Sequence, residues 1–259
     1  MKDCWNPWHG CRKYSEGCLN CYVYRRDASV GRDASQVQKT REFFLPLQKS
    51  RGGEWKIPPG SLLYTCMTSD FFLEEADLWR PEAWEIMRKR PDVRFHIITK
   101  RVLRVKDCLP PDWGDGYSNV VLGATCENQR RAQERMDAFL ALPFQEKFLI
   151  CEPLLGPIDF SSWLPGGVRE IIVGGESGPG ARELRYEWVL SLRAQCERAK
   201  IGFHFKQTGA NFVKDGRRYF LERALQIPQA RKANIDLPRV SSPENWVYIT
   251  QRTQGGDFL

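Results

Sequence analysis

Short apolar segments alternate with segments of helical periodicity along most of this 259-residue chain, and this alternation constrains its fold more than any other feature. The apolar and β-branched runs are typical of buried strands. They lie at residues 61–67, 95–99, 120–125, 148–151, 170–173 and 202–206. Because strands separated by helices form parallel βα units, the sequence predicts an α/β protein with a partial or complete parallel (β/α) TIM-like barrel.

Three segments between these strands carry apolar residues at helical spacing. Residues 80–90 have Pro81 in the first turn, and residues 128–142 end before Pro143. Residues 186–200 are followed closely by Gly202, and glycine and proline are both common beyond helix ends. Each of these segments is expected to be a helix between two strands.

Chain length predicts one domain with an appendage. Since α/β barrels often use about 200–250 residues, residues 1–209 are expected to form a single barrel domain that includes an N-terminal cysteine-rich loop at 1–24. Asp215 and Gly216 between β-prone residues predict a hairpin. We expect residues 210–259 to contain this hairpin and a C-terminal tail or lid at 241–259.

The chain has nine cysteines, although a protein of this length needs neither disulfides nor a metal to fold. Cys11, Cys18 and Cys21 are grouped near the N-terminus, and glycines precede the first two. Glycine allows the sharp turns through which several thiolates can converge, and convergence of thiolates implies a metal. Cys66, Cys126, Cys151 and Cys196 lie in apolar contexts and are expected to pack as small hydrophobic residues.

Two metal sites fit this cysteine group. A structural zinc would take Cys11, Cys18 and Cys21 with either His9 or Cys4 as its fourth ligand. A [4Fe-4S] cluster held by three cysteines would leave one iron open to a substrate or cofactor. Thiolates suit both metals, but zinc ribbons usually have two paired-ligand knuckles and this chain has one. The spacing therefore favours the iron–sulfur cluster and leaves zinc as the alternative.

Polar residues follow each predicted strand. Because the C-terminal ends of parallel strands meet on one face of a barrel, we expect these side chains to form a single ligand-binding rim. They are Asp70, Lys100, Glu127, Asn128, Glu152, the string Gly174-Gly175-Glu176-Ser177, and Lys206 with Gln207. The string lacks the Gly-Lys-Ser/Thr ending of a phosphate loop, and Glu176 would repel a phosphate. A cationic ligand such as an ammonium or sulfonium group fits it better.

The net charge and the lengths of the apolar runs limit the kinds of partner and the cellular location that are compatible with the sequence. The formal charge of +7 is compatible with nucleic acid or another anionic substrate. The longest apolar run covers only residues 138–142, whereas a membrane-spanning helix needs about 20. No secretory signal precedes Cys4, and an odd number of cysteines does not suit oxidative pairing, so a cytoplasmic location is expected.

Several motifs together resemble the phage gene-product 37 / gene-product 68 family. They are Trp5-Asn6-Pro7, Gly10-Cys11, Gly17-Cys18 with Cys21-Tyr22, Ile98-Thr99-Lys100-Arg101, Cys151-Glu152-Pro153, Gly174-Gly175-Glu176-Ser177-Gly178-Pro179-Gly180-Ala181-Arg182 and Phe205-Lys206-Gln207. The resemblance extends over nearly the whole chain. It implies a phage or mobile-element protein in the host cytoplasm, sometimes encoded beside a three-Cys-motif partner protein.

That family resembles the radical S-adenosylmethionine enzymes, which carry a three-cysteine [4Fe-4S] site on a partial barrel. The resemblance implies that Cys11, Cys18 and Cys21 bind the cluster and that rim residues bind S-adenosylmethionine. Glu176 or Glu152 would bind the ammonium group, Asp70 or Glu127 the ribose hydroxyls, and Lys100 or Arg101 a carboxylate or anionic substrate. The six residues between Cys11 and Cys18 depart from the usual three.

Two other functions are compatible with the sequence. A zinc-stabilised module could bind nucleic acid through basic residues and through aromatic rings that stack on bases. The basic residues are Arg12, Lys13, Arg25, Arg26 and Arg32 around the cysteines and Arg217, Arg218, Arg223, Arg231 and Lys232 near the C-terminus, and the aromatic residues are Trp5, Trp8, Tyr22 and Tyr24. A barrel without catalysis could instead serve as a subunit for a partner protein.

Overall fold

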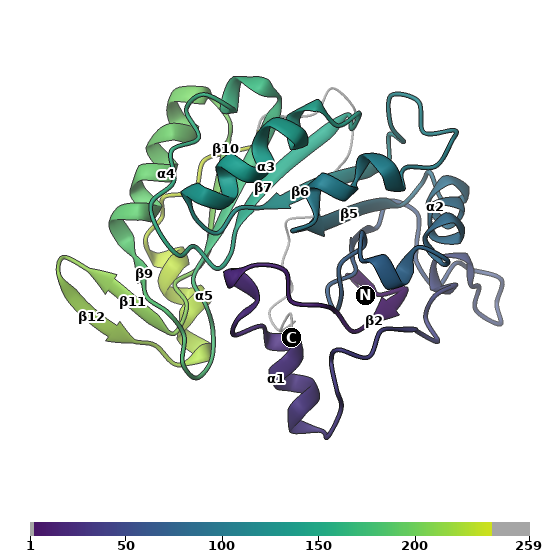
Figure 1. Cartoon of the computed structure of the whole chain (residues 1–259), viewed down its shortest axis with the longest axis horizontal. Coiled ribbons are helices and arrows are strands. Elements are labelled where there is room, and N and C mark those ends of the chain that lie inside the picture. The colour runs from purple at the N-terminus through teal and green to yellow at the C-terminus, as the bar shows by residue number, and fades with distance from the viewer. Residues whose placement is uncertain (1–2, 240–259) are drawn as a thin grey trace.

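The computed structural model describes residues 3–239, and its centre is one parallel sheet of seven strands (Figure 1). The strands lie in the order β1-β4-β5-β6-β7-β8-β10, and each neighbouring pair is parallel. Their bounds are β1 (Cys4–Trp5), β4 (Leu62–Thr65), β5 (Arg94–Thr99), β6 (Val120–Thr125), β7 (Glu146–Cys151), β8 (Val168–Gly174) and β10 (Gly202–Gln207).

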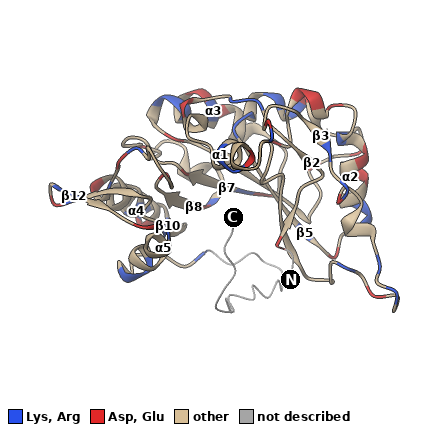
Figure 2. Ribbon diagram, turned by 90° about the horizontal axis from the view of Figure 1, so that it is seen from below, with Lys and Arg blue, Asp and Glu red and all other residues tan. Residues whose placement is uncertain are grey.

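Each successive strand of this sheet adds to the same edge, which is how a (β/α) barrel is wound. Seen from below, the sheet forms an arch with helices on its convex side (Figure 2). Within the described part of the chain, β1 and β10 are the two edges of the sheet, so the barrel is a half-barrel and is not closed. The predicted α/β class and partial parallel barrel are confirmed, and each of the six predicted strands is present.

The three predicted helices are α2 (Arg80–Lys89), α3 (Gln129–Ala141) and α4 (Tyr186–Ala199). The side chain of Asn128 caps α3 by accepting a hydrogen bond from the Arg131 amide. Helix α4 ends at Ala199, and the residue that caps it, Lys200, has a left-handed φ of 56°. Helices α1 (Tyr22–Ser29) and α5 (Arg223–Lys232) were not predicted. Helix α1 is short and follows the cysteines directly, and α5 contains Pro228.

Short 3-10 turns and a small strand pair complete the connections. The turns are η1 (Glu16–Cys18), η2 (Leu45–Leu47), η3 (Glu74–Ala76), η4 (Val102–Arg104), η5 (Lys106–Cys108) and η6 (Leu164–Gly166). Strands β2 (Trp8–His9) and β3 (Gln38–Lys39) pair antiparallel near the N-terminus.

The sheet buries apolar residues on both faces. Phe95 and Ile97 of β5 join the main core, together with the four cysteines predicted to pack as hydrophobic residues. Residues that alternate with them face the other way, because successive side chains of a strand point to opposite faces. On that concave face, Val121, Phe148 and Ile172 form a second, smaller cluster.

The C-terminal part of the described chain adds a three-stranded sheet and a helix. Strand β11 (Asn211–Lys214) pairs antiparallel with β12 (Arg217–Phe220) and parallel with β9 (Leu184–Arg185). Asp215 and Gly216 form the turn with φ values of 51° and 71°, as the sequence predicts. Helix α5 packs against β10. The predicted tail at 241–259 lies outside the described residues. Among residues 3–239, no helix is long and apolar enough to cross a membrane.

Candidate functional site

The N-terminal cysteine loop, residues 10–21, lies across the C-terminal end of the sheet (Figure 1). Backbone and side-chain hydrogen bonds attach its start to the segment that follows β4. The Gly10 amide donates to the Thr68 carbonyl at 3.2 Å, and the Ser69 hydroxyl donates to the Gly10 carbonyl. The Tyr22 hydroxyl, just beyond the loop, donates to the Met67 carbonyl. Both ends of the loop are therefore attached to the segment that follows β4.

Cys11, Cys18 and Cys21 are half-buried free thiols on this loop. Cys18 is the last residue of η1, and Cys21 immediately precedes α1. Burial raises the pKa of the Cys11 thiol to about 12, and the charges of Asp70, Cys18 and Cys21 add to this rise. Cys18 and Cys21 are thus close enough to Cys11 for their charges to affect its pKa. Among the described residues, no three His, Cys, Asp or Glu side chains already form a metal-ligand set.

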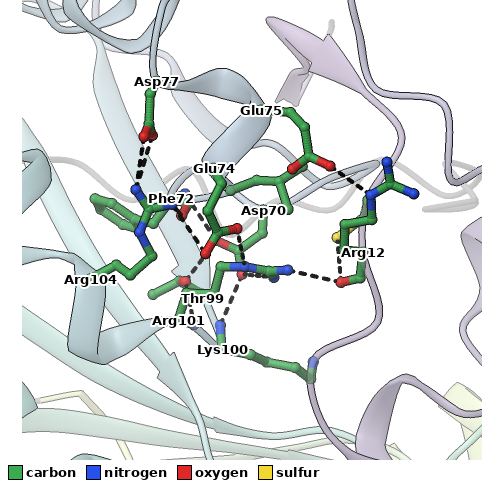
Figure 3. Close-up of polar contacts among 12 residues, drawn as sticks. Arg12, Asp70, Phe72, Glu74, Glu75, Asp77, Thr99, Lys100, Arg101 and Arg104 are labelled. Atoms are coloured by element: carbon green, nitrogen blue, oxygen red, sulfur yellow. Dashed lines mark hydrogen bonds and ion pairs between the residues drawn. The ribbon is translucent and has the colours of Figure 1, made fainter.

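Asp70 and Arg101 form a buried polar network that reaches the carbonyl of Arg12 in the cysteine loop (Figure 3). Asp70 accepts hydrogen bonds from the Thr99 hydroxyl at 2.8 Å and from the Lys100 amide at 3.1 Å. Arg101 lies 3.6 Å from the Asp70 carboxylate, and it also donates to the Arg12 carbonyl at 3.0 Å. The Asp70 carboxylate therefore connects the ends of two strands and, through Arg101, the cysteine loop.

Glu127 anchors the middle of the cysteine loop. It accepts a hydrogen bond from the Ser15 hydroxyl and forms a 2.8 Å ion pair with Arg135, and both side chains of this pair are at most 1% exposed. Gly17 lies directly against Glu127, because a Cβ at Gly17 would be 2.6 Å from the Glu127 Cγ. Glycine is therefore required at this position for the loop to approach the rim closely.

Asn128 and Arg131 hold Glu16, the next residue along the loop. The Asn128 amide donates to Glu16 at 2.6 Å, and the Arg131 guanidinium lies 2.5 Å from the same carboxylate. These hydrogen bonds, chiefly that of Arg131, lower the pKa of Glu16 to about 2. The Asn128 side chain thus caps α3 and also binds the cysteine loop through Glu16.

Glu176 anchors the end of the cysteine loop. Its carboxylate accepts from the Asn20 amide at 2.9 Å and forms an ion pair with Arg182 at 2.5 Å. Arg182 also donates to the Glu16 carbonyl at 2.8 Å. Burial alone would raise the pKa of Glu176, but the hydrogen bonds from Arg182 and Asn20 outweigh it and lower that pKa. The carboxylate predicted to bind a cationic ligand is thus paired with a cation of the chain itself.

Glycines in the string after β8 allow neighbouring groups to pack closely at the C-terminal edge of the sheet. A Cβ at Gly178 would overlap the Arg25 guanidinium of α1, and one at Gly175 would lie 2.8 Å from the Thr208 carbonyl carbon. A Cβ at Gly174 would lie 2.8 Å from a carboxylate oxygen of Glu152. Ser177 is half-buried.

Glu152, Lys206 and Gln207 form a separate group, the rim trio, at the ends of β7 and β10. Glu152 lies 2.8 Å from the Lys206 amine and 2.5 Å from the Gln207 amide nitrogen. The Glu152 side chain is 18% exposed. Glu152 contributes to the raised pKa of Tyr22, as does Cys21, although burial is the main cause of that rise. The rim trio therefore lies near the cysteine loop without being bonded to it.

Lys100 is the other rim cation that the loop does not engage. Its backbone amide binds Asp70, while its side chain extends toward the N-terminal segment (Figure 3). Within residues 3–239 its amine has no ion pair. Arg101, by contrast, is only 3% exposed and is held by Asp70 and Arg12, so of the two predicted cations Lys100 is the accessible one.

The two proposed fourth ligands for zinc lie in different places. His9 is held through Nε2 by Asp27 at 2.5 Å, and Asp27 is itself buried on α1. Cys4 lies on β1 and is paired in register with Tyr64. Neither residue is on the cysteine loop.

For each contact that holds the loop, the sequence predicted the rim residue but not its partner. Asp70, Glu127, Asn128 and Glu176 were predicted as ligand-binding residues, and the structure has them in contacts that fix the loop. Their partners Ser15, Glu16, Asn20, Arg131 and Arg182 were not predicted. Polar loop residues carry no periodic signal, and only Gly17 indicates that the loop packs closely.

The fold and the site together define a class of protein. It is a parallel half-barrel with a cysteine-bearing loop bonded to the C-terminal edge of its sheet. The chain belongs to the family described as "Protein of unknown function (DUF5131)", whose family model matches residues 1–245. No curated protein and no solved structure matches the chain. Its function is therefore inferred from the site.

Proposed function

We propose that this protein is an iron–sulfur enzyme of the radical S-adenosylmethionine type. The observation that carries the proposal is the placing of three free thiols, Cys11, Cys18 and Cys21, at the C-terminal edge of a parallel half-barrel. Active sites of barrel enzymes lie at this edge. Three thiolates are also the ligand set that leaves one iron of a four-iron cluster open.

The surroundings of the three thiols fit such a cluster. Arg101 is a buried cation next to Cys11 in the chain fold, because it donates to the carbonyl of the adjacent Arg12 at 3.0 Å. A cation there offsets the negative charge of thiolate ligands. The loop is held at Ser15, Glu16 and Asn20, and binding of a cluster would require the three thiols to converge on the metal and lose their protons. The cluster, when bound, supplies the electron that cleaves a carbon–sulfur bond of S-adenosylmethionine.

Glu152 is the rim carboxylate best suited to the ammonium group of S-adenosylmethionine. Asp70, Glu127 and Glu176 hold the loop and neighbouring residues, as described above, whereas among residues 3–239 the bonds of Glu152 are those to Lys206 and Gln207. Lys206 and Gln207 keep it oriented. Lys100 is a cation that could bind the carboxylate of the same ligand or an anionic substrate.

The test of cluster binding is anaerobic reconstitution with iron and sulfide. The wild-type protein should turn brown and retain about four irons with sulfide. Cys11→Ala, Cys18→Ala and Cys21→Ala should each lose most of this iron, whereas Cys108→Ala, which alters a half-buried thiol on η5, should not. Colourless protein with stoichiometric zinc would contradict the proposal.

The test of the rim trio is binding of S-adenosylmethionine measured by calorimetry on the reconstituted protein. Glu152→Gln removes the charge that pairs with the ammonium group and should weaken binding about tenfold or more, because a charged hydrogen bond is worth about 1.5–3 kcal/mol. Glu134→Gln changes an ion-paired carboxylate of α3 and serves as the control. Equal affinities for the two variants would exclude Glu152 from the ligand site.

A further inference from the structure

Strand β12 and helix α5 form an exposed surface that the proposed chemistry does not use. The four residues of β12 are all exposed, and β12 is the outer strand of its three-stranded sheet. Phe220 is 79% exposed and Tyr219 is 43% exposed. Figure 1 shows this hairpin projecting from the body of the protein, next to α5. We call β12 and α5 together the ribbon surface.

Large apolar side chains are concentrated on the ribbon surface. Besides the two aromatic residues of β12, Leu225 is 44% exposed and Ile227 is 38% exposed on α5. Helix α5 buries Gln226 and Ala230 instead. Tyr219 and Phe220 point to opposite faces of β12, so an extended ligand could contact an aromatic ring on either face of the hairpin. Four exposed apolar side chains within nine residues still distinguish this segment.

The same segment is strongly basic. Residues 211–232 contain six Lys and Arg against two Asp and Glu, so they carry +4 of the formal charge of +7. Within the described residues, Arg217, Arg223, Arg231 and Lys232 have no ion pair, whereas Arg218 is paired with Glu183 at 2.9 Å. Figure 2 shows Lys and Arg on β12 and on α5.

The spacing of residues along α5 places charge and apolar surface together. Arg223, Ile227 and Arg231 are four residues apart, so they lie along one side of the helix. All three are exposed. A ligand with a phosphate backbone and attached bases could contact both cations and an apolar side chain on that side of the helix.

The ribbon surface lies beside the rim that carries the candidate active site. Strand β11 begins four residues after β10 ends at Gln207, on the C-terminal edge of the half-barrel. The Asn211 amide donates to the Ala181 carbonyl in the glycine-rich string at 3.2 Å. A long ligand on the ribbon surface can therefore extend toward the cysteine loop.

We infer that the ribbon surface binds single-stranded nucleic acid. Unpaired cations attract the phosphate backbone, and exposed aromatic rings stack on unpaired bases, whichever base is present. A duplex has its bases stacked inside and cannot offer them to Phe220 and Tyr219. This inference does not depend on the iron–sulfur cluster, because it concerns a surface outside the cysteine loop.

The direct test is fluorescence anisotropy of the full chain, without cluster, with a labelled 15-nucleotide oligothymidine and with a labelled duplex of equal length. If four cations contact phosphates, the affinity for the single strand should fall with salt with a log–log slope of about −3. Raising the salt about fourfold should then weaken binding by about 50-fold. Salt-independent binding, no binding, or stronger binding of the duplex would overturn the inference.

Two variants locate the binding surface. Phe220→Ala should weaken binding about tenfold, since base stacking on one aromatic ring is worth about 1–3 kcal/mol on alanine substitution. Arg223→Gln with Arg231→Gln should reduce the salt slope to about −1.4. The matched control joins Leu78→Ala, 90% exposed before α2, with Arg51→Gln, an exposed loop residue. Wild-type binding by both ribbon variants would place the nucleic acid elsewhere and refute the inference.

Discussion

Replacing Glu127 by glutamine tests how much the buried ion pair between Glu127 and Arg135 contributes to the stability of the protein. Glu127 is 0% exposed, and its carboxylate is the counter-ion of Arg135, which is 1% exposed. The remaining hydrogen-bond partner of Arg135 is the Thr125 carbonyl at 2.6 Å, and two of its nitrogens are buried without a hydrogen-bond partner. Glu127→Gln keeps the size of the side chain but leaves the guanidinium buried without a counter-ion among the described residues.

Removing one partner of a buried ion pair costs about 3–5 kcal/mol, so Glu127→Gln should lower the free energy of unfolding by that amount. The loss of the Ser15 hydrogen bond to a charged oxygen contributes to it. Glu127→Gln combined with Arg135→Met removes the uncompensated charge as well. The double variant should therefore be within about 1–2 kcal/mol of the wild type, since paired replacement by uncharged residues is often close to neutral.

Urea unfolding followed by circular dichroism at pH 7 measures both effects. Glu134→Gln is the control, on the helix that carries Arg135, because Glu134 is 30% exposed and its partner Arg131 keeps Glu16 as a second carboxylate. Its cost should be at most about 1 kcal/mol. A loss below about 1 kcal/mol for Glu127→Gln, or a double variant no more stable than the single one, would refute this account of the pair.

Two further changes test other parts of the structure. Gly17→Ala places a Cβ against the buried Glu127 and should destabilise the protein by about 1–3 kcal/mol, whereas exposed Gly52→Ala should change stability by less than about 0.5 kcal/mol in the same urea assay. Burial, with the charges of Arg94 and Arg239, lowers the pKa of His96 to about 3. The unfolded chain therefore takes up a proton at His96 below pH 6.5 that the folded chain does not, so stability falls as the pH drops from about 6.5 toward 3. Between pH 7 and pH 4 the wild type should lose about 3 kcal/mol more than His96→Gln, and parallel losses would contradict the assignment.

The sequence predicted the architecture well because the strands are buried on both faces. Continuous apolar runs such as 120–125 signal a central parallel strand by composition alone, and proline or glycine bounded each helix between them. Strand β1 has only Cys4 and Trp5 in the sheet, which is too short for any periodic signal. Helix α5 was not predicted because Pro228 and scattered apolar residues conceal its periodicity.

The sequence predicted where the polar residues of the candidate site lie better than it predicted what each of them binds. Strand ends correctly located Asp70, Glu127 and Glu176, but the rule that strand ends form a binding rim does not say what they bind. Their partners come from a loop more than 100 residues away from Glu127 in the chain. A carboxylate that binds a ligand and one that binds Asn20 look the same in a sequence, and only three-dimensional contacts distinguish Glu152 from the others.

In the function proposed above, the cysteine loop and the rim trio together perform radical chemistry on S-adenosylmethionine. The most direct measurement is formation of 5′-deoxyadenosine by the reconstituted, chemically reduced protein, followed by mass spectrometry under anaerobic conditions. The account predicts 5′-deoxyadenosine from the wild type and from Cys108→Ala, and none from Cys18→Ala. Wild-type protein with a full complement of iron and sulfide that forms no 5′-deoxyadenosine when reduced would contradict it.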